Sequence, residues 1–150
     1  MSSISTSPTE GTATRRRKAR LLRLLAVAGS AAATFIVWLI AGKALGVDLR
    51  QPAFDLHAPQ PMQAGFVAAV GAIAALVGWG LLALFERFSE RGERIWLFVA
   101  IGALAVSLIG PFSGHGISSG DRVALVCMHL AAAAIVIPLL HRSSKVASHS

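Results

Sequence analysis

The long apolar stretches of this 150-residue chain contain no aspartate or glutamate, and the whole chain contains a single cysteine, Cys127. One cysteine cannot form an intramolecular disulfide, and no CxxC redox or metal motif is present. Proton-coupled small multidrug transporters of comparable size need a carboxylate within the membrane, so the missing acidic residues argue against that class. Charge is scarce overall: charged residues make up 14% of the chain, against about 25% in soluble domains.

Hydrophobic residues instead make up 55% of the chain, and most of them lie in four long apolar runs. About 20 helical residues span a hydrocarbon core of roughly 30 Å. The pattern therefore predicts an all-α bundle of four transmembrane helices, at about 24–45, 64–86, 94–112 and 122–141. We expect residues 1–20 to form a disordered, basic cytoplasmic tail, residues 21–142 the four-span membrane domain, and residues 143–150 a second cytoplasmic tail.

Two of the runs leave room for another interpretation. The first follows a basic segment and contains a signal-peptidase-like site at Ala31-Ala32-Ala33. It continues well past that site, so we interpret it as a span and not as a cleaved signal peptide. The third run is short, and we expect it either to use Trp96 at one membrane interface and Phe112 at the other, or to lie where the bilayer is thinner.

Basic residues set the expected orientation. With the N-terminus inside, eleven lysines and arginines fall on the cytoplasmic side and three on the other. This bias predicts cytoplasmic N- and C-termini (N-in/C-in) in the cell membrane, and the Ala-, Gly- and Arg-rich composition suggests a bacterial source. Five of the eleven form a cluster before the first run: Arg15, Arg16, Arg17, Lys18 and Arg20. We favour a role in orientation over recognition of anionic lipid headgroups.

The net charge of +7 does not predict nucleic-acid binding. The basic residues flank apolar runs and do not form one surface stripe with aromatic partners. The expected partners are the lipid bilayer and possible copies of the chain or another membrane protein, with no nucleic acid.

Polar residues inside the spans are the candidates for function, and His129 is the only histidine inside the apolar runs, the last of which is Val123 to Leu140. It lies seven residues beyond Arg122, about 10 Å into the membrane in a helix. Our hypothesis is a polar cluster of His129, Ser107 and Trp38 in the outer half of the bundle. The alternative, which we favour, is that the imidazole bonds a backbone carbonyl or Ser107 and only holds helices together.

Two stripes are predicted to pack helices against each other. Ser30, Thr34 and Trp38 follow one another at intervals of four and share a face of the first helix. Their hydroxyls are expected to bond back to their own helix or across to a neighbour. In the second helix, Gly71, Ala75 and Gly78 form a stripe of small residues that permits close approach of another helix.

Other polar residues receive weaker interpretations. Cys127 and His129 point to nearly opposite sides of a helix, so they cannot share a metal. A metal site of His57, His115 and His129 would require loops that fold inward. Asp121 is expected to cap the fourth helix. We interpret the charged connection between the second and third runs as a solvated turn, with a binding patch as the alternative.

Short motifs along the apolar region also suggest a family. They are Val37-Trp38, Gly78-Trp79, Gly110-Pro111, Met128-His129 and Ile137-Pro138. From about Leu24 to Arg142 the chain resembles a family of small bacterial four-span membrane proteins classed as a domain of unknown function. This resemblance implies the four-helix membrane fold and brings no activity, ligand or catalytic residue.

The sequence thus predicts a protein that is not an enzyme, holds no cofactor and acts through helix–helix interactions. One alternative is a subunit of an oligomeric transporter or channel, and another is a redox or metal helper that uses His129.

Overall fold

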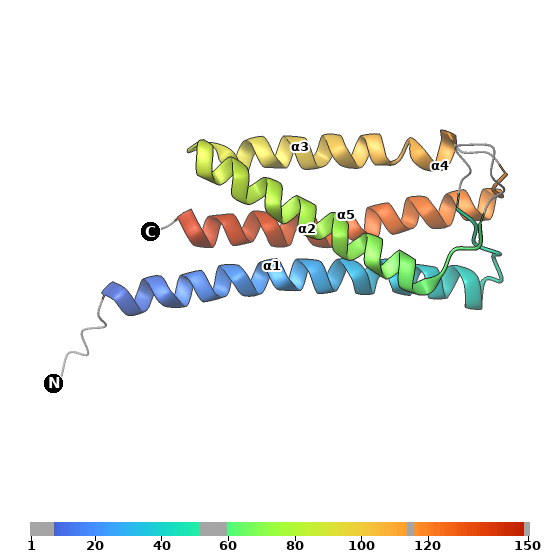
Figure 1. Ribbon diagram of the computed structural model, residues 1–150, viewed down its shortest axis with the longest axis horizontal. Coiled ribbons are helices and arrows are strands. Elements are labelled where there is room, and N and C mark those ends of the chain that lie inside the picture. The colour runs from blue at the N-terminus through green and yellow to red at the C-terminus, as the bar shows by residue number, and fades with distance from the viewer. Residues whose placement is uncertain (1–7, 52–59, 114–115, 149–150) are drawn as a thin grey trace.

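The computed structural model describes residues 8–51, 60–113 and 116–148, and Figure 1 shows an elongated bundle of four long helices. These are α1 (Pro8–Leu39), α2 (Ala64–Phe88), α3 (Gly92–Ser107) and α5 (Ser119–Ser148). A π-helical turn, η1 (Ile40–Ala44), extends α1, and a short helix, α4 (Gly110–Ser113), follows α3. Four helical segments are long and apolar enough to cross a membrane. The predicted all-α, four-span architecture is confirmed.

The first and last helices are longer than expected. α1 begins at Pro8 and α5 continues to Ser148, so residues 8–20 are helical where a disordered tail was expected, and residues 143–148 continue α5. That these two segments lie in the cytoplasm stays a prediction. Proline is well tolerated at the first position of a helix, and the Arg- and Ala-rich segment that follows favours helix. The two helices run antiparallel and pack against each other, although residues 11–18 of α1 are exposed (Figure 1). Residues 1–7 lie outside the described part of the chain.

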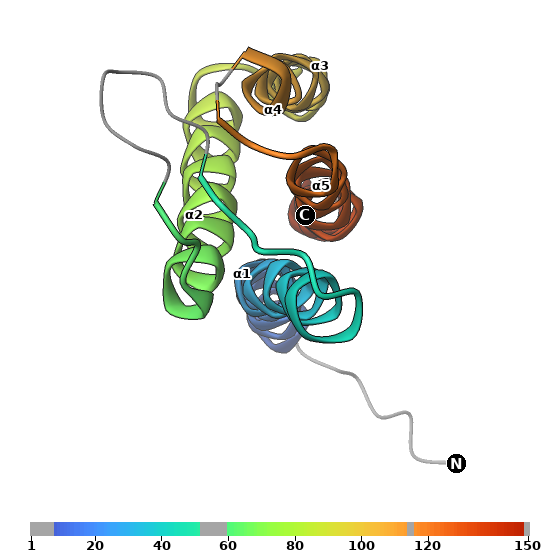
Figure 2. The same ribbon diagram turned by 90° about the vertical axis from the view of Figure 1, so that its right-hand side faces the viewer.

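α1 begins and α5 ends at the same end of the bundle, which we call the terminal end; the opposite one is the loop end (Figure 1). Seen along the bundle, α5 lies between α1 and α3, and α2 lies to one side of all three (Figure 2). The start of α2 bonds to α1, whereas its second half receives a bond from α3: Trp96 donates to the Gly78 carbonyl at 2.8 Å. α2 therefore crosses the bundle obliquely.

The bundle has a separate apolar cluster at each end. At the loop end, Ala41, Leu49, Met62, Val67, Ala124, Leu125 and Met128 are buried together. At the terminal end, Ala26, Leu82, Trp96 and Leu140 form the second cluster. Leu49 and Met62 come from the connection between α1 and α2, whose described parts pair in an extended arrangement through the Met62 amide and the Leu49 carbonyl, 2.8 Å apart. This connection closes the loop end.

The third span differs from its prediction. The helix breaks between Ser107 and Gly110, because Pro111 has no amide hydrogen to continue the ladder. Trp96 is 1% exposed, so it belongs to the core of the bundle and not to a membrane interface. The expectation for Trp96 was wrong because an indole that donates to a carbonyl is satisfied inside the bundle.

Asp121 stabilises the start of α5, but it lies three residues inside the helix cap and is not itself the cap residue that the sequence predicted. Ser118 is the cap: its hydroxyl accepts from the Asp121 amide at 3.1 Å, and Asp121 Oδ2 accepts from the Ser118 amide at 2.7 Å. This reciprocal pair is a capping box, with the acidic residue three positions after the cap. Asp121 Oδ1 also accepts from the Arg50 amide at 3.3 Å, which fastens the loop to α5.

Candidate functional site: a cavity within the membrane

Hydroxyl groups join α1 to α2 along the predicted polar stripe. The Ser30 hydroxyl donates to the Gly71 carbonyl at 2.9 Å. The Thr34 hydroxyl lies 3.0 Å from the Ser30 carbonyl oxygen and 3.3 Å from that of Val67. It can therefore bond back within α1 or across to α2. We call this contact the α1–α2 seam; in the absence of water, such bonds satisfy polar groups that would otherwise be costly.

The small residues of α2 lie at helix contacts within the chain. A methyl group added at Gly71 would meet the Thr34 hydroxyl oxygen at 2.5 Å and the Ser30 carbonyl oxygen at 3.0 Å. Ala75 is fully buried, and an added methyl at Gly78 would touch Leu140 at 3.5 Å. The stripe therefore packs α2 against its own neighbours, as small residues in membrane helices commonly do.

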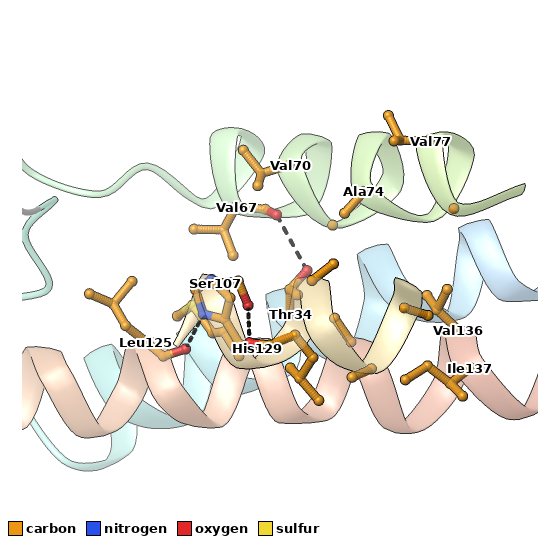
Figure 3. A pocket seen from close by; sticks show the side chains of 18 of the residues that line it. Thr34, Val67, Val70, Ala74, Val77, Ser107, Leu125, His129, Val136 and Ile137 are labelled. Atoms are coloured by element: carbon orange, nitrogen blue, oxygen red, sulfur yellow. Dashed lines mark hydrogen bonds between the residues drawn. The ribbon is translucent and has the colours of Figure 1, made fainter. Parts of the chain in front are cut away.

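Beside this seam, and sharing Thr34, Val67 and Gly71 with it, the helices leave a cavity of about 490 Å³ between α2, α3 and α5. Its lining includes Phe66, Val70, Ala74 and Val77 of α2, Val99, Ala103 and Ser107 of α3, and Met128, His129, Ala132, Ala133 and Val136 of α5 (Figure 3). Thr34 contributes from α1. Among the described residues the lining holds no charged side chain, and its polar hydrogen-bonding side chains are Thr34, Ser107, His129 and Trp96.

The cavity opens on the α2–α3 side of the bundle. Its lining residues on that side are exposed, for example Phe66, Val70 and Val99, whereas Leu125 and Met128 at its floor on α5 are buried. Because both mouth-forming helices are spans, the opening faces the bilayer laterally. A lipid-soluble molecule can therefore reach the cavity without passing through water.

His129 is half-buried and lines this cavity. Its Nδ1 lies 2.7 Å from the Leu125 carbonyl oxygen, one turn back in α5 (Figure 3). A bond to a backbone carbonyl is therefore present, but it lies within α5 and joins no two helices, so the expected role of His129 in holding helices together stays a prediction. Cys127, two residues before, is exposed on the outside of α5, which agrees with the predicted divergence of the two side chains.

The structure brings together two of the three residues in the proposed polar cluster. Ser107 lines the same cavity as His129, but its hydroxyl donates to the Leu104 carbonyl at 2.7 Å. Trp38 is not part of the lining; it donates to the Met62 carbonyl at 2.9 Å and packs on the loop-end cluster. Each of the three side chains bonds a backbone carbonyl, and none bonds another member of the cluster.

A polar cluster at the terminal end was not anticipated. Arg23 of α1 pairs with Glu86 of α2 at 2.9 Å and donates to the Ser143 hydroxyl of α5 at 3.1 Å. Glu93 of α3 and His141 of α5 lie 2.9 Å apart. The connection between α2 and α3 is therefore only partly a solvated turn, because Glu86 and Glu93 face other helices. The sequence did contain a signal for this cluster, because all of these charged residues flank the apolar runs on the same predicted side of the membrane.

The five basic residues of the predicted cluster lie in the exposed first part of α1 at the terminal end: Arg15, Arg16, Arg17, Lys18 and Arg20. Their helical placement differs from the expected disordered tail, whereas their exposure suits contact with a lipid surface.

The described residues contain no group of three histidines, cysteines or carboxylates that could hold a metal ion. Two of the three histidines in the conceivable metal site, His57 and His115, lie outside the described residues. That site therefore stays a prediction.

Four apolar helices of spanning length, joined by buried backbone-directed hydrogen bonds, define a multi-pass membrane protein. Within this class, the chain belongs to the family of unknown function DUF6069, whose model matches residues 14–146. No curated protein and no solved structure matches the chain. The family agrees with the expected resemblance and assigns no activity.

Proposed function

We propose that this protein binds an apolar, lipid-soluble molecule in the cavity between α2, α3 and α5, and that it does so without catalysis. The observation that carries the proposal is the cavity itself, about 490 Å³ with an uncharged and mostly aliphatic lining. Ligand pockets occupy about 300–1,000 Å³ and combine apolar walls with a few polar groups. Apolar cavities in proteins stay free of water and accept apolar guests.

A photoreactive alkane that carries a diazirine tests this function in reconstituted liposomes. We expect saturable cross-links to Ala132, Ala133 and Val136, mapped by mass spectrometry. The variant Ala103→Phe fills the cavity and should remove these cross-links. Ala105→Phe is the matched control, because Ala105 is exposed on the same helix and does not line the cavity.

Labelling that does not saturate, and that Ala103→Phe leaves unchanged, would show that the alkane samples only the bilayer around the bundle. The ligand function would then be lost. Labelling reduced equally by both phenylalanine variants would also contradict it, because the effect would not depend on the cavity.

We further propose that the protein resides in a bacterial cell membrane with both termini in the cytoplasm. The support is the bias of eleven basic residues against three, together with the placement of both helix ends at the terminal end (Figure 1). A reporter enzyme that is active only outside the cytoplasm, fused after residue 148, should be inactive. The same reporter inserted near Gly116 should be active, and the reverse result would invert the topology.

A second candidate function is association with another copy of the chain or another membrane protein. The support for this function is that α3 is the least buried of the four spans. In its membrane-spanning part 11% of the residues are buried inside the bundle, against 22% in each of the other three helices. The stripe of Gly71, Ala75 and Gly78 does not support this function, because those residues pack within the chain. Cross-linking between cysteines placed at Gly102, which faces open space, tests whether α3 meets a second copy.

A further inference from the structure

The hydrogen bond of His129 determines which ring nitrogen carries a proton. A carbonyl oxygen can only accept, so the contact of 2.7 Å with Leu125 requires a hydrogen on Nδ1. In a neutral imidazole the other nitrogen, Nε2, is then an acceptor with a free lone pair. The two nitrogens point to different sides of the ring, so Nε2 is directed away from the α5 backbone.

Among the described residues the one hydrogen bond of His129 is through Nδ1, and Nε2 is not among the buried side-chain atoms that lack a partner. Nε2 is therefore accessible from the cavity. The nearest polar neighbours in the cavity use their hydroxyl protons elsewhere: Ser107 donates to Leu104 and Thr34 to backbone carbonyls of its own helix or α2. An acceptor left unpaired in an apolar environment is unfavourable, and the bilayer offers no water to satisfy it.

We infer that the ligand of this cavity is a neutral, apolar molecule that carries a hydroxyl group, and that this hydroxyl donates to Nε2 of His129. The inference rests on the proposed ligand-binding function and names the chemical class of the ligand. An alkane, ether or ketone brings no donor to Nε2. A carboxylate, phosphate or ammonium group brings a charge, which the uncharged lining does not neutralise.

Two competitors for the photoreactive alkane separate these classes: dodecyl alcohol, and its methyl ether as the matched control without a donor. One hydrogen bond of ordinary net strength predicts that the alcohol competes about fivefold more strongly than the ether. His129→Phe keeps a ring of similar size and removes the acceptor. In that variant the two competitors should become equal while the ether keeps its wild-type affinity.

Nitrogen-15 NMR of histidine-labelled wild-type protein supplies a readout that does not depend on a variant's folding. The resonance absent from His129→Phe identifies the imidazole, and its Nε2 signal should be that of an unprotonated nitrogen. Dodecyl alcohol should shift that signal toward the hydrogen-bonded value, and the ether should leave it unchanged.

Ser107→Ala tests the competing arrangement in which the Ser107 hydroxyl turns to Nε2. Our inference predicts that the alcohol keeps its advantage in this variant. An advantage that is absent from the wild type and appears only in Ser107→Ala would overturn the inference, because Ser107 would then occupy the acceptor.

The two proposals fail in distinguishable ways. If alcohol and ether compete equally well in the wild type, and Ala103→Phe still abolishes labelling, the cavity binds apolar molecules and the hydroxyl inference is wrong. If labelling in the wild type does not saturate and Ala103→Phe leaves it unchanged, the ligand-binding function itself is wrong.

Discussion

α2 presents two adjacent faces to the rest of the bundle, which share Val67 and Gly71, and they pack in different ways. Toward α1, glycine and hydroxyl-bearing residues meet at hydrogen-bonding distance, as in the bond of 2.9 Å from Ser30 to Gly71. Toward α3, branched and aromatic side chains such as Phe66 and Val70 surround a cavity of about 490 Å³. In a bilayer, lipid tails pack against aliphatic side chains as well as another helix does. Close packing therefore follows the small and polar residues, and the aliphatic side remains open.

The largest expected effect comes from breaking the α1–α2 seam at Gly71. Gly71→Ala places a methyl group 2.5 Å from the Thr34 hydroxyl oxygen and 3.0 Å from the Ser30 carbonyl oxygen, so either Thr34 must leave its hydrogen-bonding position or the helices must separate. Overpacking of this kind costs about 2–3 kcal/mol. Reversible unfolding in detergent should show this loss. Gly80→Ala is the control on the same helix, because an added methyl there meets nothing within 4 Å. Equal stability of the two variants would show that the seam is not closely packed.

The next effect concerns Arg23, which joins the same three helices at the terminal end. Arg23→Met removes the cation beside Glu86, whose side chain is 26% exposed, and the bond to Ser143. A partly buried carboxylate without its partner should cost about 1–2 kcal/mol, less than a fully buried pair because water screens it. Arg87→Met, at an exposed neighbouring site, should leave the free energy of unfolding unchanged. A matching loss in both variants would indicate a general effect of charge.

A smaller effect isolates the hydroxyl contribution to the seam. Thr34→Val keeps the shape of the side chain and removes its bonds to Ser30 and Val67. Interhelical hydrogen bonds in membranes contribute about 0.6 kcal/mol on average, so we expect a loss of that size. Ser113→Ala removes an exposed hydroxyl bonded within its own turn and serves as the comparison. If Thr34→Val caused no measurable loss in the free energy of unfolding, the seam would be stabilised by close packing alone and not by the hydrogen bonds of Thr34.

The smallest effect is expected on the open side. Ala103→Phe adds a ring where the cavity offers space, so the free energy of unfolding should change by less than about 0.5 kcal/mol. Gly71→Ala and Ala103→Phe together test the difference between the seam and the cavity most directly. One added methyl group destabilises the seam, whereas the cavity accommodates a whole ring. A loss as large as that of Gly71→Ala would show that α3 packs tightly in the membrane.

Sequence patterns predicted the membrane-spanning architecture well because apolar length is a local property. The four runs, the stripe of Ser30 and Thr34, and the backbone bond of His129 follow from composition and helical spacing. The helix ends were less predictable. Residues 8–20 looked like a polar tail, yet they form the first turns of α1, and the Arg- and Ala-rich segment among them has high helix propensity. Trp96 looked like an interface anchor, yet it is buried against the Gly78 carbonyl of another helix.

The sequence by itself determined that this chain spans a membrane four times, because backbone groups in a bilayer must bond within each helix. Only the tertiary structure decided which faces meet. The oblique crossing of α2 brings Gly71 against α1 and leaves Phe66 and Val70 beside a cavity that His129 and Ser107 share. No local pattern specifies such a crossing, since it depends on how side chains from four helices fill the space between them.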